Sequence, residues 1–164
     1  MADLDRFRAA QEDPGTGFTT ALRELRAGRK TSHWIWYVFP QLAGLGSSPT
    51  ARHFGLADVG EAAAYLRHSV LGARLAEAVA AVHSHVTAPR PIPIETLMGS
   101  HVDALKLVSC LTLFRQVARA LVAGEPRPEW MALAAEARAI LDAASAQGLP
   151  PCRFTEEHCR SARR

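Results

Sequence analysis

The sequence has few cysteines, and their spacing is not that of pairs. Its 164 residues include three, Cys110, Cys152 and Cys159, and an odd number without paired spacing argues against a disulfide framework. This pattern favours a reducing compartment, so we expect a cytoplasmic protein. The step from Cys152 to Cys159 is longer than the spacing of most zinc ligands. We therefore expect no metal site.

Long apolar runs and basic stripes are also missing. The most apolar stretch, Val102–Phe114, is interrupted by Asp103 and Lys106, and the N-terminal residues lack the pattern of a signal peptide. We therefore expect no membrane association. The formal net charge is only +3, and no row of basic residues alternates with aromatics, so we expect no specific nucleic-acid partner. No dinucleotide or redox motif is present, which leads us to expect no cofactor. The sequence identifies no protein partner.

Apolar residues recur at helical spacing along most of the chain, and 48% of all residues are apolar. The pattern predicts about seven helices and at most one strand, hence an all-α fold. We expect a single compact orthogonal multi-helix domain over residues 1–150 and a mobile basic C-terminal tail at 151–164. Ser48, Asp58 and Ser100 are expected to be helix N-caps, and Gly28 is expected to end a helix. The expected helices cover about 4–10, 18–27, 58–66, 70–86, 102–122 and 129–147, and one more is expected to start at Pro49.

An aromatic segment occupies residues 30–41. Four of the eleven aromatic residues of the chain lie there within six positions: Trp34, Trp36, Tyr37 and Phe39. Its spacing does not decide between helix and strand, although Pro40 should end either element. Four adjacent rings cannot all face the core, so at least one should point elsewhere. With Lys30, His33 and Gln41 at its rim, the segment is either purely core or one wall of a small-molecule pocket.

A glycine- and serine-rich segment follows. Gly44, Gly46 and Ser48 precede a helix start, where free N–H groups favour an anion such as phosphate. The alternative is an ordinary loop with a helix cap. The segment lacks the lysine of a Walker motif, so the pattern alone does not decide between the two.

Polar residues form a row on an otherwise apolar helix. Asp103, Lys106, Ser109 and Thr112 follow one another in steps of three, so their side chains are neighbours. Asp103 and Lys106 could pair with each other, or Lys106 could reach a ligand anion or the aromatic segment. On the same helix, we expect nearly complete burial of the apolar residues Leu105, Val108, Leu111 and Phe114.

Three stretches of the chain resemble a known family. Residues 28–48 read GRKTSHWIWYVFPQLAGLGSS, 61–75 read EAAAYLRHSVLGARL, and 103–114 read DALKLVSCLTLF. They resemble the uncharacterised bacterial family called domain of unknown function 1810, over about residues 3–122. The resemblance implies a compact, mostly helical domain and no established activity.

These observations lead to one main hypothesis. We expect a small-molecule site for a nucleotide-like or phosphorylated metabolite, where residues 30–41, 44–48 and 103–112 meet around one cavity. The expected ligand-binding residues are Lys30, His33, Trp34, Trp36, Gln41, Gly44, Gly46, Ser48, Asp103, Lys106 and Ser109. If the protein is an enzyme, a hydrolase or transferase fits best, with His33 and Lys106 as candidate catalytic residues. The alternative is a non-enzymatic protein-interaction module that uses an exposed aromatic patch.

Overall fold

Helices start and stop where the sequence supplies capping residues. The side chains of Ser48, Asp58 and Ser100 each accept a hydrogen bond from the backbone N–H three residues later. Each bond satisfies a donor that the first helical turn leaves without a partner. Gly28 has a φ of 84° and follows Ala27, the C-cap of the second helix. All four predicted helix boundaries are thus confirmed.

The computed structural model describes residues 3–163, and 68% of the chain is helical. Within these residues there is no strand, only an isolated parallel bridge between Leu42 and Leu56. The predicted all-α class is therefore confirmed. Ten helices lie within residues 3–163: α1 (Asp5–Gln11), α2 (Phe18–Arg26), α3 (Ile35–Val38), α4 (Pro49–Phe54), α5 (Val59–Arg67), α6 (Ser69–Val86), α7 (Ile94–Met98), α8 (His101–Gly124), α9 (Pro128–Ala146) and α10 (Arg153–Ser161).

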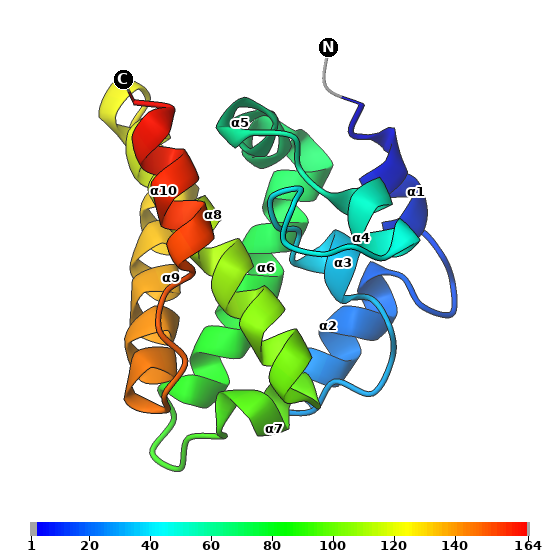
Figure 1. The fold of residues 1–164 in the computed structure, drawn as a ribbon. Coiled ribbons are helices and arrows are strands. Elements are labelled where there is room, and N and C mark those ends of the chain that lie inside the picture. Colours follow the sequence, from blue (N-terminus) through cyan, green and yellow to red (C-terminus); the bar gives the residue numbers. More distant parts are fainter. Residues whose placement is uncertain (1–2, 164) are drawn as a thin grey trace.

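The long helices α6, α8 and α9 form the centre of the molecule. α9 packs along α8 and also against α6, while α5 crosses both α6 and α8. Figure 1 shows α1 to α4 gathered on one side of α6, and α10 beside α8 and α9 on the other. The short helix α3 contacts both α6 and α8. The aromatic segment therefore lies against the middle of the domain.

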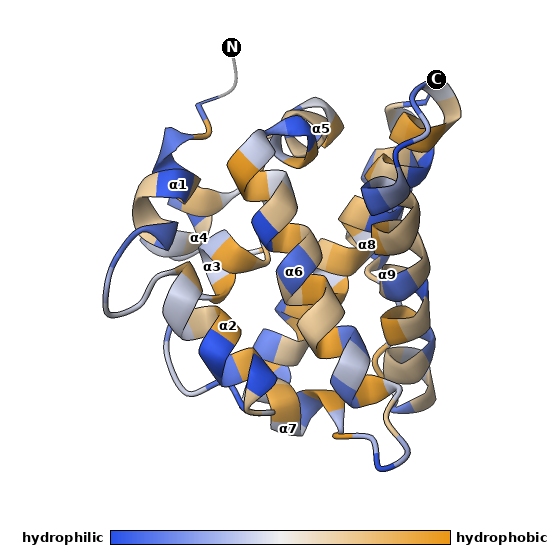
Figure 2. Ribbon diagram, turned by 180° about the vertical axis from the view of Figure 1, so that it is seen from behind, coloured by the Kyte–Doolittle hydropathy of each residue, from blue (hydrophilic) through white to orange (hydrophobic). Residues whose placement is uncertain are grey.

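The helices differ in how apolar and polar residues are distributed along them. In Figure 2, hydrophobic and hydrophilic residues share the turns of α2 and α6, as expected of helices that bury one side. By length and composition alone α8 could cross a membrane, but 56% of its most apolar window is buried among the other helices. Such burial is the environment of a core helix.

Two expectations differ from the structure. Within residues 3–163 there are ten helices instead of about seven, because periodicity did not separate the short helices α3 and α7 from turns and α10 lies in the expected tail. Residues 151–164 were expected to form a mobile tail, yet α10 lies there and packs against α8. Thr155 and Cys159 of α10 are buried, so one side of this basic helix packs against the rest of the domain.

Candidate functional site

Lysine is rare in this chain, and both lysines contact the same carboxylate. Of the 19 lysine and arginine residues, only Lys30 and Lys106 are lysines. The Lys30 Nζ lies 2.7 Å from Asp103 Oδ2, and the Lys106 Nζ lies 3.7 Å from Asp103 Oδ1. Two segments that are distant in sequence are therefore joined at Asp103, on the first turn of α8.

Lys30 is the buried member of this cluster. Its side chain is only 5% exposed, and its ammonium also donates a hydrogen bond to the backbone oxygen of Ser32. The ammonium lies 5.0 Å from the centroid of the Trp34 ring. A buried charge is tolerated only when it is paired and hydrogen-bonded, and Lys30 meets both conditions inside the protein.

Glu24 of α2 fixes the other edge of Trp34. Its carboxylate accepts hydrogen bonds from the Trp34 Nε1, at 2.9 Å, and from the backbone and hydroxyl of Thr31. Burial raises the pKa of the Glu24 carboxyl, but the hydrogen bonds from Thr31 and Trp34 outweigh burial and lower the pKa to about 2. Sequence reasoning missed Glu24, because a single acidic residue on an amphipathic helix gives no sign of burial.

The aromatic segment has one ring that is not fully buried. Trp34, Tyr37 and Phe39 are buried, whereas Trp36 is half-buried. The Lys106 ammonium lies 4.4 Å from the centroid of the Trp36 ring, within the range of a cation–π interaction. Lys106 therefore contacts both Asp103 and the aromatic segment, so the two alternatives left open by the sequence occur together.

Two hollows meet at Lys106. The larger, which we call the groove, has a volume of about 320 Å³ and is lined by Gln41, Leu45, Val102, Leu105, Lys106, Val108, Ser109, Pro150 and Cys152. The smaller, which we call the slot, has a volume of about 10 Å³ and is lined by Ile35, Trp36, Phe39, Gln41, Ala51, Phe54 and Lys106. Gln41 and Lys106 line both hollows. Among the described residues that line either one, Lys106 alone carries a charge.

The three segments expected to meet around one cavity, residues 30–41, 44–48 and 103–112, do so only in part. Gln41 comes from the aromatic segment, Leu45 from the glycine-rich loop, and Lys106 and Ser109 from α8, and all four line the groove. His33 is exposed and is not among the residues that line the groove or the slot. Its backbone oxygen accepts a hydrogen bond from the Tyr37 hydroxyl at 3.2 Å. The Ser109 hydroxyl donates to the backbone oxygen of Leu105.

The glycine-rich loop has a structural explanation of its own. Gly44 has a φ of 96°, and a Cβ added there would lie 3.1 Å from the Phe154 ring of α10. Gly46 is half-buried, and a Cβ there would lie 2.7 Å from that of Ala51. Ser48 caps α4 through the Ala51 N–H. These residues are therefore explained by backbone geometry and close packing, and only Leu45 brings this loop to the groove.

The expectation for Leu105 was wrong. Val108, Leu111 and Phe114 are buried as predicted, but Leu105 is 41% exposed. Together with Val102, which is also exposed, it borders the groove. α8 is apolar around most of its circumference, so the sequence pattern could not indicate which apolar stripe faces outward.

The C-terminal residues of the groove were also missed. Pro150 and Cys152 close one side of it, and the backbone N–H of Cys152 donates to the Thr112 hydroxyl at 3.1 Å. Their distance from α8 in sequence gave no signal for this contact. Within residues 3–163, no three His, Cys, Asp or Glu side chains gather as metal ligands would.

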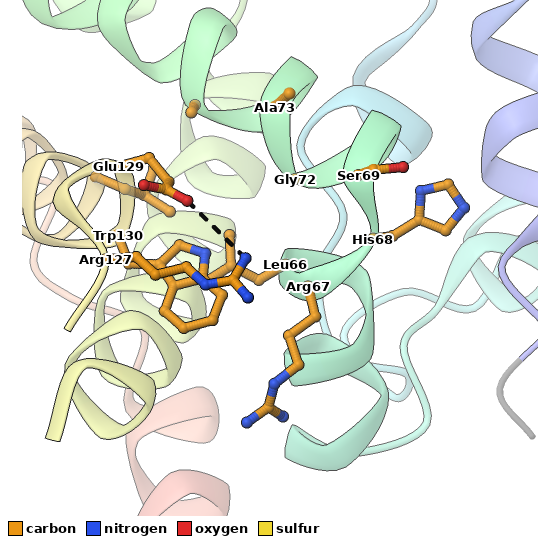
Figure 3. A pocket seen from close by; sticks show the side chains of 11 residues that line it. Leu66, Arg67, His68, Ser69, Gly72, Ala73, Arg127, Glu129 and Trp130 are labelled. Carbon is orange, nitrogen blue, oxygen red and sulfur yellow. Dashed lines mark ion pairs between the residues drawn. The ribbon is translucent and has the colours of Figure 1, made fainter. Parts of the chain in front are cut away.

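A further hollow lies where the turn between α5 and α6 meets the start of α9 (Figure 3). Its volume is about 150 Å³. Arg127 lies 4.6 Å from the centroid of the Trp130 ring and pairs with Glu125 and, as the dashed line in Figure 3 marks, with Glu129. This arginine already has two carboxylate partners, and Arg67, the other arginine of this hollow, is exposed. Lys106, by contrast, is partly buried and shares one carboxylate with a second lysine. The groove is therefore the better candidate for an anionic ligand.

Comparison with known proteins places the chain in a family. The family described as Protein of unknown function (DUF1810) matches residues 1–126, and the chain belongs to it. The crystal structure of the conserved hypothetical protein Rv1873 from Mycobacterium tuberculosis is similar, with 40% sequence identity, a TM-score of 0.68 and 93% of each chain covered. A search of curated proteins finds no match.

Proposed function

We propose that this member of the DUF1810 family binds a small organic anion in the groove. The ligand carries a carboxylate or phosphate group that Lys106 binds, and an apolar body that lies along α8. Nucleotide-like and other phosphorylated metabolites belong to this class. The observation that carries the proposal is the position of Lys106 at the junction of the groove and the slot, where it is the charged residue among those that line them.

The balance of charge around Asp103 supports an anionic ligand. Lys30 and Lys106 both contact this carboxylate, so two positive charges share one negative charge. Lys30 is nearly buried and lies closer to the Asp103 carboxylate, so the attraction of Lys106 to this carboxylate is the weaker of the two. Glu24 is engaged elsewhere, by Thr31 and Trp34. An anion in the groove would supply the missing negative charge.

The lining of the groove supports an organic ligand of modest size. Most of its residues are apolar, including Leu45, Val102 and Leu105, while Gln41 and Ser109 add polar groups. This mixture is typical of small-molecule sites, and a volume of about 320 Å³ is near the lower end of their size range.

The proposal is one of binding and does not include turnover. A hydrolase or transferase would need a second group able to move a proton close to Lys106. His33, the candidate considered from the sequence, lies on an exposed position outside the residues that line the groove. Binding by Lys106 needs no such partner.

A thermal-shift screen tests the proposal directly. The wild-type protein is heated with aryl carboxylates, aryl phosphates and nucleoside monophosphates, each compared with its uncharged alcohol or nucleoside. A ligand at a hundred times its dissociation constant should stabilise the fold by about 2.7 kcal/mol. Only the charged member of a pair should do so, and added salt should weaken the effect.

Two matched variants locate the site. Lys106→Met removes the ammonium but keeps most of the apolar stem, so the anion-dependent shift should disappear. Arg127→Met is the control, because Arg127 also stacks on a tryptophan and pairs with carboxylates, but lines the other hollow. The shift should survive in this control. A shift of equal size in Lys106→Met and wild type would refute the proposal.

A further inference from the structure

The two lysines at Asp103 are held with unequal strength. Lys30 lies 2.7 Å from the carboxylate, is almost fully buried and has Ser32 as a second acceptor. Lys106 lies 3.7 Å from the same carboxylate, and its side chain is 21% exposed. Beyond Asp103, the contact that the structure gives the Lys106 ammonium is the face of Trp36. Lys106 is therefore the member of the pair that can move without breaking up the buried cluster.

Lys106 covers the aromatic surface closest to the groove. The Trp36 ring lines the slot, the groove lies on the other side of Lys106, and both hollows share Lys106 and Gln41. A change in the Lys106 side-chain torsions would uncover the face of Trp36 and join the slot to the groove. Lysine side chains have several torsions, so such a movement requires no change in the backbone.

We infer that the ligand is a planar aromatic anion, and that its ring takes the place of the Lys106 ammonium on Trp36 while Lys106 turns to bind its anionic group. The inference rests on the function proposed above and adds the shape of the ligand and the movement of Lys106. Aromatic rings stack in offset or edge-to-face arrangements, and an ammonium forms stronger, charge-assisted hydrogen bonds with a carboxylate or phosphate than with a ring face. The bound state therefore replaces one weak contact, between Lys106 and Trp36, with two better ones: the anionic group of the ligand binds Lys106, and its ring stacks on Trp36.

The scarcity of lysine makes this movement measurable. Protein grown with lysine labelled with carbon-13 at Cε gives two lysine signals, because the chain has two lysines. The Lys106 signal should show an upfield ring-current shift from Trp36 and should be absent from the spectrum of Lys106→Met, which assigns it. Lys30, held by Asp103 and Ser32, serves as the internal reference.

Two probes with the same charge distinguish anion binding in the groove from stacking of the ligand ring on Trp36. The probes are 2-naphthoate, which is planar, and decahydro-2-naphthoate, which has the same carbon skeleton but is saturated and not planar. We expect 2-naphthoate to bind more tightly by several-fold to about tenfold and to remove the upfield shift of the Lys106 signal, with little change at Lys30. Equal affinities, with the Lys106 signal still shifted upfield, would overturn this inference and leave the proposed function standing. No binding of either carboxylate at millimolar concentration, together with no stabilisation by any phosphate of the thermal-shift screen, would overturn both.

A variant of the stacking surface completes the test. In Trp36→Leu, decahydro-2-naphthoate should bind about as well as in wild type, whereas the preference for 2-naphthoate should be lost. Trp36→Phe retains an aromatic face of smaller area and should show an intermediate preference. It provides the test if the leucine variant fails to fold. An unchanged preference in a folded Trp36→Leu protein would show that the ring of the ligand lies elsewhere.

Discussion

The Lys30 ammonium lies 2.7 Å from the Asp103 carboxylate, which ties the segment before α3 to the first turn of α8. Loss of one partner from a buried ion pair is costly, because it leaves the other charge without compensation. We predict that Asp103→Asn lowers the free energy of unfolding by roughly 2–4 kcal/mol, below the most severe cases because Asp103 is partly exposed. Urea denaturation measures this loss.

Loss of the other partner, Lys30, should destabilise the protein less. Lys30→Met leaves Asp103 with Lys106 as a partner, so we predict less than half of the loss seen for Asp103→Asn. Asp142→Asn is the control, since the exposed Asp142 lies 3.9 Å from Arg138 and surface pairs contribute about 0–1 kcal/mol. Equal losses for Asp103→Asn and Asp142→Asn would contradict the structural role assigned to this cluster.

The Glu24 carboxylate should make stability depend on pH in the acid range. Its pKa is lowered from a usual value of 4.5 to about 2 in the folded protein. The stabilisation is therefore fully present above pH 4.5 and is lost as the pH falls toward 2, with a slope of up to about 1.4 kcal/mol per pH unit. Glu24→Gln should be less stable than wild type at pH 7, and the difference in the free energy of unfolding should narrow between pH 4.5 and pH 2.

Urea denaturation at several pH values checks this prediction. Glu12→Gln is the matched control, because Glu12 is exposed and its substitution should leave the pH profile of wild type unchanged. A difference between wild type and Glu24→Gln that stays constant from pH 7 to pH 2 would argue against hydrogen-bond stabilisation of the ionised carboxylate.

Two leucines on α8 should respond very differently to truncation. Leu111 is fully buried, so Leu111→Ala should cost roughly 2–5 kcal/mol. Leu105 is 41% exposed, and Leu105→Ala should cost less than about 1 kcal/mol. Chemical denaturation of the two variants measures both values. Similar losses would mean that Leu105 is part of the core and does not border an open groove.

This contrast also shows what could be predicted from sequence. The N-caps at Ser48, Asp58 and Ser100 depend on neighbours three residues away, and such local signals predicted the helix starts correctly. The exposed position of Leu105 could not be predicted, because α8 has apolar residues around most of its circumference. Periodicity identifies a buried side only when a polar side contrasts with it.

Contacts between distant residues were predicted less completely than local structure. At least one ring of the aromatic segment was expected to point away from the core, and Trp36 is the ring that is only half-buried. The lysine expected to need an anion does contact Asp103. The sequence hypothesis brought residues 30–41 and 103–112 together, but it did not predict that Lys30 binds the same carboxylate, because nothing local to either residue encodes this pairing. The role of Glu24 was missed for the same reason.

The last prediction concerns α10, which the sequence suggested would be a mobile tail. Thr155 and Cys159 are buried, and Phe154 approaches Gly44 of the loop that brings Leu45 to the groove. Deleting residues 153–164 removes these contacts. It should lower the free energy of unfolding by more than about 1 kcal/mol and weaken anion binding, because the loop that brings Leu45 to the groove would lose its contact with Phe154. Deleting 163–164 alone, beyond the end of α10, should change neither property measurably. If the longer deletion were as mild as the shorter one in urea denaturation, α10 would contribute nothing to the fold.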